Sequence, residues 1–135
     1  MLAHQRNFEI IPLVGPSSII LALMASGLNG QNFAFNGYLP KEREERIKKI
    51  KALEKRSLSE NQTQIVMDTP YRNQHVFADI LSYADPQTLL CLAMDLTGKE
   101  QYIKTLPVKA WKQMNFSLAK KPALFLIHKR TSTHS

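Results

Sequence analysis

Two corners of this 135-residue sequence, each at an expected passage from a strand to a helix, carry residue types that bind small ligands. In Gly15-Pro16-Ser17-Ser18, glycine permits close approach of the backbone and the serines offer hydroxyl groups. The other corner is Met67-Asp68-Thr69-Pro70-Tyr71-Arg72. The first turn of a helix has unpaired N–H groups and a positive dipole end, and ligands of α/β sheets bind beyond the carboxyl ends of strands. Both corners are therefore candidate binding sites, although both sequences also make good helix caps in proteins of any function.

The common catalytic patterns are missing from the sequence. It has no Gly-x-Ser-x-Gly, no P-loop, no Gly-x-Gly-x-x-Gly and no His-Glu-x-x-His. The four histidines are scattered, so no metal site is expected, and His75 and His128 are expected at the surface. The single cysteine, Cys91, lies in an apolar run and is expected to be an inert core residue. One cysteine also excludes an internal disulfide framework and fits a reducing cytosol.

Alternating strands and helices must position the two corners. Strands are predicted over 8–14, 33–38, 63–67, 88–94, 102–106 and 122–128, the fourth of them central and the fifth near an edge. Helices are predicted over 19–25, 41–56, 70–84 and 107–114, with 57–62 as a polar loop. Thr69 is the expected N-cap of the third helix, with Pro70 in its first position. The order β-α-β-α-β-α-β-β-α-β predicts an α/β fold with a mixed, mostly five-stranded sheet and helices on both faces.

Composition and charge restrict the class of protein. A length of 135 residues with 44% hydrophobic residues suits one globular domain. The longest apolar stretch, 19–25, is too short to cross a membrane. The formal net charge of +7 is uneven, because residues 41–56 hold eight Lys and Arg against four Glu, and residues 99–135 hold eight against one. This excess is either a solvated surface or a site for an anionic partner.

Four motifs resemble, in the same order, those of a known enzyme family. They are IIPLVGPSSIILALMASGL at 10–28, FAFNGYLP at 33–40, MDTPYR at 67–72 and DLTGK at 95–99. The chain from residue 8 to 128 thereby resembles the tetrapyrrole methylase superfamily, and within it the 16S rRNA 2′-O-ribose methyltransferase I family. Three departures are Ser18 in place of the usual alanine, Met67 in place of an aromatic residue, and the inserted Gly98.

The resemblance implies a domain arrangement. Enzymes of this superfamily have two α/β domains, and their glycine-rich cofactor loop lies in the N-terminal one. Residues 1–130 are therefore expected to be the C-terminal domain, lacking its N-terminal partner and inactive alone, with 131–135 as a frayed tail.

The resemblance also implies S-adenosyl-L-methionine (SAM) as cofactor, held between the two domains. The positions that match the family's cofactor contacts are Ser17, Ser18, Met67, Asp68, Leu96, Thr97, Pro122 and Ala123. Tyr71, Arg72 and Lys99 are the candidate substrate contacts. Because a sulfonium donor is intrinsically reactive, positioning carries much of the rate. The residues suggest no catalytic base, and Arg72 could instead pair with Asp68 or Asp95 and only stabilise its corner.

Three functions remain open at this point. The first is methyl transfer to a ribose 2′ oxygen of ribosomal RNA, in a cytoplasmic homodimer without membrane association. The second is C-methylation of a uroporphyrinogen- or precorrin-like tetrapyrrole. The third is a non-catalytic module that binds RNA through its basic helix, although the sequence has no RNP-type aromatic motif.

Overall fold

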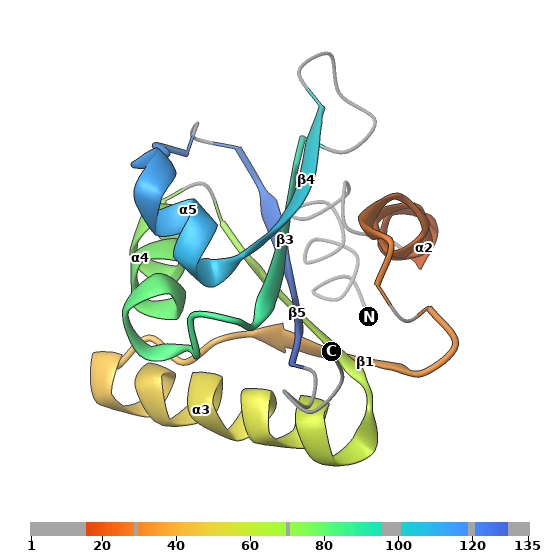
Figure 1. Ribbon diagram of the computed structural model, residues 1–135. Helices are drawn as coiled ribbons and strands as arrows, with labels where there is room; N and C mark the ends of the chain where they lie inside the picture. The colour runs from red at the N-terminus through yellow and green to blue at the C-terminus, as the bar shows by residue number, and fades with distance from the viewer. Residues whose placement is uncertain (1–15, 29, 70, 96–100, 119–120, 130–135) are drawn as a thin grey trace, which may run out of the picture.

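The computed structural model describes residues 16–28, 30–69, 71–95, 101–118 and 121–129 (Figure 1). The predicted strand over 8–14 and the predicted tail lie outside these ranges. Among the described helices, none has the length and apolar character needed to span a bilayer.

A mixed five-stranded sheet forms the centre of the described fold. Its strands are β1 (Phe33–Tyr38), β2 (Thr63–Asp68), β3 (Leu89–Met94), β4 (Tyr102–Pro107) and β5 (Ala123–His128), in the spatial order β1-β2-β5-β3-β4. β1 and β2 run parallel, joined through a helix, whereas β2–β5, β5–β3 and β3–β4 are antiparallel. The expected mixed sheet and the edge position of β4 are confirmed. The strand predicted to be central, β3, lies beside the centre, which β5 occupies; both are apolar on both faces, so hydrophobicity alone does not rank them.

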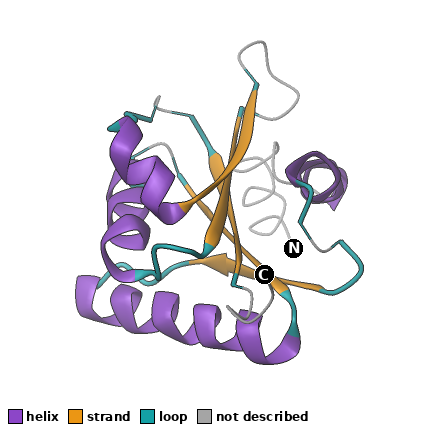
Figure 2. Cartoon of the chain, in the orientation of Figure 1, coloured by secondary structure: helices purple, strands orange, loops and turns teal. Residues whose placement is uncertain are grey.

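Helices cover both faces of the sheet, as predicted. α2 (Pro16–Ser26) lies on one face, and α3 (Arg43–Glu60), α4 (Asn73–Tyr83) and α5 (Val108–Met114) lie on the other (Figures 1 and 2). The alternation of strand side chains separates two cores: Ile65 packs with α2, whereas its neighbour Val66 packs with α3 and α4. The larger core centres on Phe77, whose ring meets Trp111 edge-on at 5.6 Å.

Two predicted boundaries are wrong for identifiable reasons. α3 continues through residues 57–60, which were expected to be loop, and ends at Asn61 with a left-handed φ of 50°. The polar residues over 57–60 predict a polar loop, but Ser57 is fully buried. Its Oγ accepts a hydrogen bond from the N–H of Lys129 at 2.9 Å. α4 begins at Asn73 with Arg72 as N-cap, not after Thr69. The carbonyl oxygen of Thr69 instead accepts from the N–H groups of Arg72 and Asn73, which makes a turn ahead of the helix.

The isolated cysteine and histidines divide between core and surface. Cys91 is buried on the α2 side of β3, so its expected place in the core is confirmed, and burial raises the pKa of its thiol. His75 is exposed as expected. His128 is buried, contrary to expectation, because its Nδ1 lies 3.2 Å from Oγ1 of Thr63 across the inner strands.

Candidate functional site

The strand ends that carry the predicted site meet along one edge of the sheet. β1, β2 and β3 end there, and β4 and β5 begin there. The register pairs Asp68 with Ala123, Ala123 with Met94, and Met94 with Tyr102, while Tyr38 aligns with the residue before Asp68. We call this row of five residues, with the backbone around it, the site edge.

Half of the predicted cofactor residues lie at the site edge. Met67 and Ala123 are 6% and 2% exposed, and Asp68 is paired in register with Ala123. The carbonyl oxygen of Pro122 accepts a hydrogen bond from the N–H of Asp95 at 3.3 Å, which joins the end of β3 to the start of β5. Segments more than 50 residues apart in the sequence are therefore brought together here.

The other predicted site residues belong to the start of α2 and to the segment after β3. Ser17 and Ser18 lie in the first turn of α2, where the structure describes the backbone only. Leu96, Thr97 and Lys99 follow the end of β3 but lie outside the described residues. The far end of α2 is attached to the sheet, because Oγ1 of Thr105 donates to the carbonyl oxygen of Ser26 at 2.9 Å.

An ion pair between Asp68 and Arg72 fixes the second corner. Oδ2 of Asp68 lies 3.2 Å from Nη2 of Arg72, and Oδ1 accepts from the N–H of Thr69 at 2.7 Å. The same Nη2 donates to the carbonyl oxygen of Leu39 at 3.0 Å. These contacts connect the end of β2, the residue after β1 and the start of α4. The adjacent Tyr71 is 87% exposed and therefore accessible to a large partner.

Burial controls the ionisation of the site edge. It raises the pKa of Asp68, against the opposing effects of the Thr69 N–H and the positive charges of Arg72 and Arg46. Burial, and then the negative charge of Asp68, raise the pKa of Tyr38, while burial raises that of Tyr102. Both phenols are therefore protonated at neutral pH and are unsuited to act as bases.

Two polar contacts and one backbone conformation at this end of the sheet were missed from the sequence. Nζ of Lys121 lies 4.0 Å from Oδ2 of Asp95, so the structure pairs Asp95 with a lysine and leaves Asp68 as the partner of Arg72. Asp95 adopts a left-handed φ of 51°. Nδ2 of Asn73 donates to the carbonyl oxygen of Lys121 at 2.7 Å. No local pattern indicates these contacts, because each joins segments distant in sequence.

Two further features border the site edge. The ring of Tyr102 stacks on Phe116 at 5.2 Å, and Phe116 also lines a cavity of about 280 Å³ between α4 and α5. Among the described residues, no group of three or more His, Cys, Asp or Glu is arranged to hold a metal ion. The described part of the site edge therefore combines buried apolar side chains, strand-end backbone groups and the guanidinium of Arg72, which is bound by Asp68 and Leu39.

Comparison with solved structures defines the class of the fold. No protein-family model matches the chain. The crystal structure of the methyltransferase CobJ superposes on 82% of this chain and 47% of its own, with a TM-score of 0.52 and 16% identity. At that identity the likeness concerns the fold alone, which is an α/β fold with a mixed five-stranded sheet.

Comparison with curated proteins gives the particular relatives. The ribosomal RNA small subunit methyltransferase I of Buchnera aphidicola subsp. Schizaphis graminum is 32% identical over 124 residues, which are 90% of this chain and 42% of that protein. The protein of the same name from Vibrio cholerae serotype O1 is 31% identical over 105 residues, or 78% and 35%. The chain is thus related in sequence to ribosomal RNA small subunit methyltransferase I, as its four motifs predict, and it spans about two-fifths of these relatives' length.

Proposed function

We propose that residues 1–130 are the C-terminal domain of a two-domain SAM-dependent methyltransferase, and that 131–135 form a tail. The observation that carries the proposal is the convergence of Met67, Asp68, Pro122 and Ala123 on one sheet edge. The family motifs place cofactor contacts at these positions, and the curated relatives are methyltransferases.

The residues at the site edge fit half of a nucleoside-binding cleft. Met67 and Ala123 are buried apolar residues that pack into the cores on opposite faces of the sheet, and they flank strand ends whose backbone groups are of the kind that read the edge of a nucleobase. Leu96 and Thr97 after β3, and Ser17 and Ser18 in the first turn of α2, complete the proposed contact set. SAM supplies an activated methyl group when bound. The residues of this chain orient it and exclude water, and the N-terminal domain covers the other side.

The proposed substrate is ribosomal RNA, with transfer to a ribose 2′ oxygen. The names of the relatives, the net charge of +7 and the positions of Tyr71 and Arg72 support this choice. Arg72 is held on one side by Asp68 and Leu39, while a guanidinium offers five N–H donors. Its remaining donors suit a phosphate, and Lys99 comes shortly after β3 in the sequence. By the same resemblance, the complete protein acts in the cytoplasm as a homodimer.

The complete protein tests this function with two substrates side by side. It is incubated with SAM labelled in the methyl group and either small-subunit ribosomal RNA or uroporphyrinogen. We expect label in the RNA, at a nucleotide whose 3′ linkage resists alkaline cleavage because the 2′ oxygen is blocked. Label in the tetrapyrrole alone, or in neither substrate, would overturn the proposal.

A further inference from the structure

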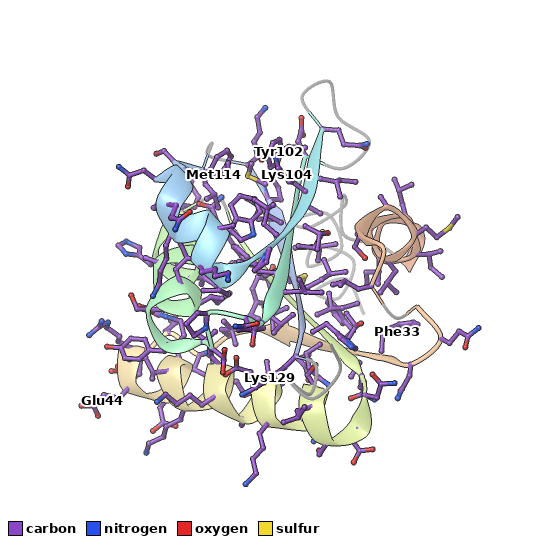
Figure 3. All side chains as sticks on the ribbon, in the orientation of Figure 1. Phe33, Glu44, Tyr102, Lys104, Met114 and Lys129 are labelled. Atoms are coloured by element: carbon purple, nitrogen blue, oxygen red, sulfur yellow. The ribbon has the colours of Figure 1, made fainter. Side chains whose placement is uncertain are left out.

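The middle of α3 presents an exposed surface of one charge. Between Arg46 and Ser59, every exposed charged side chain is positive. These side chains, which we call the α3 cationic face, are Lys48, Lys49, Lys51, Lys55 and Arg56. Figure 3 shows nitrogen-tipped side chains that project from α3 on the side away from the sheet.

The other charged residues in this part of α3 are engaged inside the protein. The guanidinium of Arg46 lies 2.6 Å from Oδ2 of Asp79, with both side chains below 10% exposed. The carboxylate of Glu54 accepts hydrogen bonds from the N–H of Asp85 at 2.7 Å and from the hydroxyl of Thr88. Glu54, which could otherwise neutralise the exposed lysines, is thus turned inward. The positive charge of Arg46 is compensated by Asp79 inside the protein.

The stability of the helix does not explain the outer lysines. The dipole of α3 is complemented by acids in its first turn, and its last turn holds no basic residue. Lys48, Lys51 and Lys55 follow one another at spacings of three and four residues, where like charges destabilise a helix. One exposed pair offsets this repulsion in part, between Lys48 and Glu45 at 3.8 Å. The face thus keeps like charges close together on one side of the helix.

α3 is anchored at its start, and the α3 cationic face begins near the site edge. Lys48 and Lys55 are two helical turns apart, or about 10 Å, with Lys51 between them on the same side. α3 is held at its start by Arg46, whose Nη1 donates to the carbonyl oxygen of Lys41 at 2.9 Å. The loop before α3 includes Leu39, whose carbonyl oxygen accepts from Arg72. A strand of RNA contacting Arg72 can therefore continue along α3.

We propose that the α3 cationic face binds the phosphate backbone of RNA beside the nucleotide presented at the site edge. This inference rests on the proposed RNA substrate. It adds a second contact area, in which positive charges spaced along a helix meet successive phosphates without reading bases. The Tyr83 ring, approached by the charged groups of Arg43 at 5.7 Å and Lys51 at 5.9 Å, borders the face toward α4.

The test compares two charge-matched triple variants of the full chain. One combines Lys48→Gln, Lys51→Gln and Lys55→Gln. The control combines Lys104→Gln, Lys109→Gln and Lys112→Gln, which removes three exposed lysines from β4 and α5. Binding of a fluorescently labelled RNA oligonucleotide is measured by anisotropy over a salt series, and circular dichroism verifies that each variant folds.

We expect the α3 variant to bind RNA on the order of tenfold more weakly or worse, with a log–log salt slope shallower by about two units, since each lost phosphate contact removes about 0.7–0.9. The control keeps a slope near that of the unchanged chain. Equal losses in both variants, an unchanged slope in the α3 variant, or no RNA binding by the unchanged chain would overturn the inference. The inference would also be overturned if the α3 variant lost binding to anionic phospholipid vesicles while its RNA binding stayed unaltered.

The outcome is separable from that of the proposed methyl transfer. Methylation of RNA by the complete protein, with α3 variants that bind RNA normally, would remove the α3 contact and keep the enzyme. RNA binding that depends on α3, without any methyl transfer, would keep the contact and remove the enzyme.

Discussion

Arg72 is anchored by Asp68 through contacts that leave part of its guanidinium exposed. The two side chains form an ion pair at 3.2 Å, in which Asp68 is 1% exposed and Arg72 is 26% exposed. The carboxylate is thus an internal support, whereas the guanidinium lies at the boundary with solvent. Anchoring reduces the side-chain entropy that a flexible arginine would lose on binding an anion.

If Arg72 contacts RNA, replacing it with alanine should weaken RNA binding by the complete protein. The log–log salt slope should become shallower by about one unit, because one phosphate contact is lost. Asp68→Asn is the matched control, since it removes the negative partner and keeps the positive charge, so its slope should remain. Lower thermal stability of Arg72→Ala with unaltered RNA affinity would mean that the pair only stabilises the corner.

The carboxyl of Asp68 should titrate above its ordinary pKa of about 3.9, because burial raises its pKa. The folded state then binds the proton more tightly than the unfolded state. Stability from this group is fully present below the ordinary pKa and is lost as pH rises through the folded pKa. The unfolding free energy of the natural chain relative to Asp68→Asn should therefore fall over that range. A carboxyl NMR titration with a midpoint at or below the ordinary value would contradict this.

The isolated chain should bind SAM far more weakly than the complete protein, because the proposed cleft needs both domains. Isothermal titration should give no heat with this chain alone and a measurable isotherm with the complete protein. Micromolar affinity of the isolated chain would show that residues 1–135 hold the cofactor without a second domain.

Replacing Ser17 with leucine in the complete protein should weaken SAM binding and leave the melting temperature unchanged. A bulky side chain in the first turn of α2 would occupy space proposed for the cofactor. Unchanged affinity with normal melting would argue against this placement. A large fall in melting temperature would instead assign the serine to capping of the helix.

The buried ion pair between Arg46 and Asp79 should contribute much more to stability than an exposed pair on the same helix. Asp79→Ala leaves a buried guanidinium without its carboxylate and should cost about 3–5 kcal/mol of unfolding free energy. Glu45→Ala removes the partner of Lys48, where both side chains are more than 60% exposed, and should change stability by less than about 1 kcal/mol. Urea unfolding of both variants measures the difference, and similar costs would contradict it.

Local sequence patterns predicted most helices and strands, because each is specified by its own periodicity. The spacing of Ile50 and Leu53 marks α3, and the run over 122–128 marks β5. One error arises from a distant contact, because Ser57 has the sequence pattern of a loop residue and is buried by its hydrogen bond with Lys129. The other is local, because the turn at Thr69 delays the start of α4 to Asn73.

The candidate site was predictable only in part for the same reason. The family motifs identified Asp68 and Ala123 separately, but their adjacency follows from the antiparallel pairing of β2 with β5. Asp68 and Arg72 are four residues apart, and the sequence allows either Asp68 or Asp95 as the partner of Arg72; the structure shows Asp68. The contact of Lys121 with Asp95 depends on how two loops meet, which no local spacing indicates.

The central position of β5 has a consequence for synthesis of the protein on the ribosome. β5 is the last strand of the described chain, yet it lies between β2 and β3 and joins the pair β1–β2 to the pair β3–β4. Until residue 128 leaves the exit tunnel, both halves keep one apolar strand unpaired, and such edges favour misassociation. We therefore expect the nascent chain to remain a client of chaperones until β5 emerges and the two pairs of strands join in a late, cooperative step.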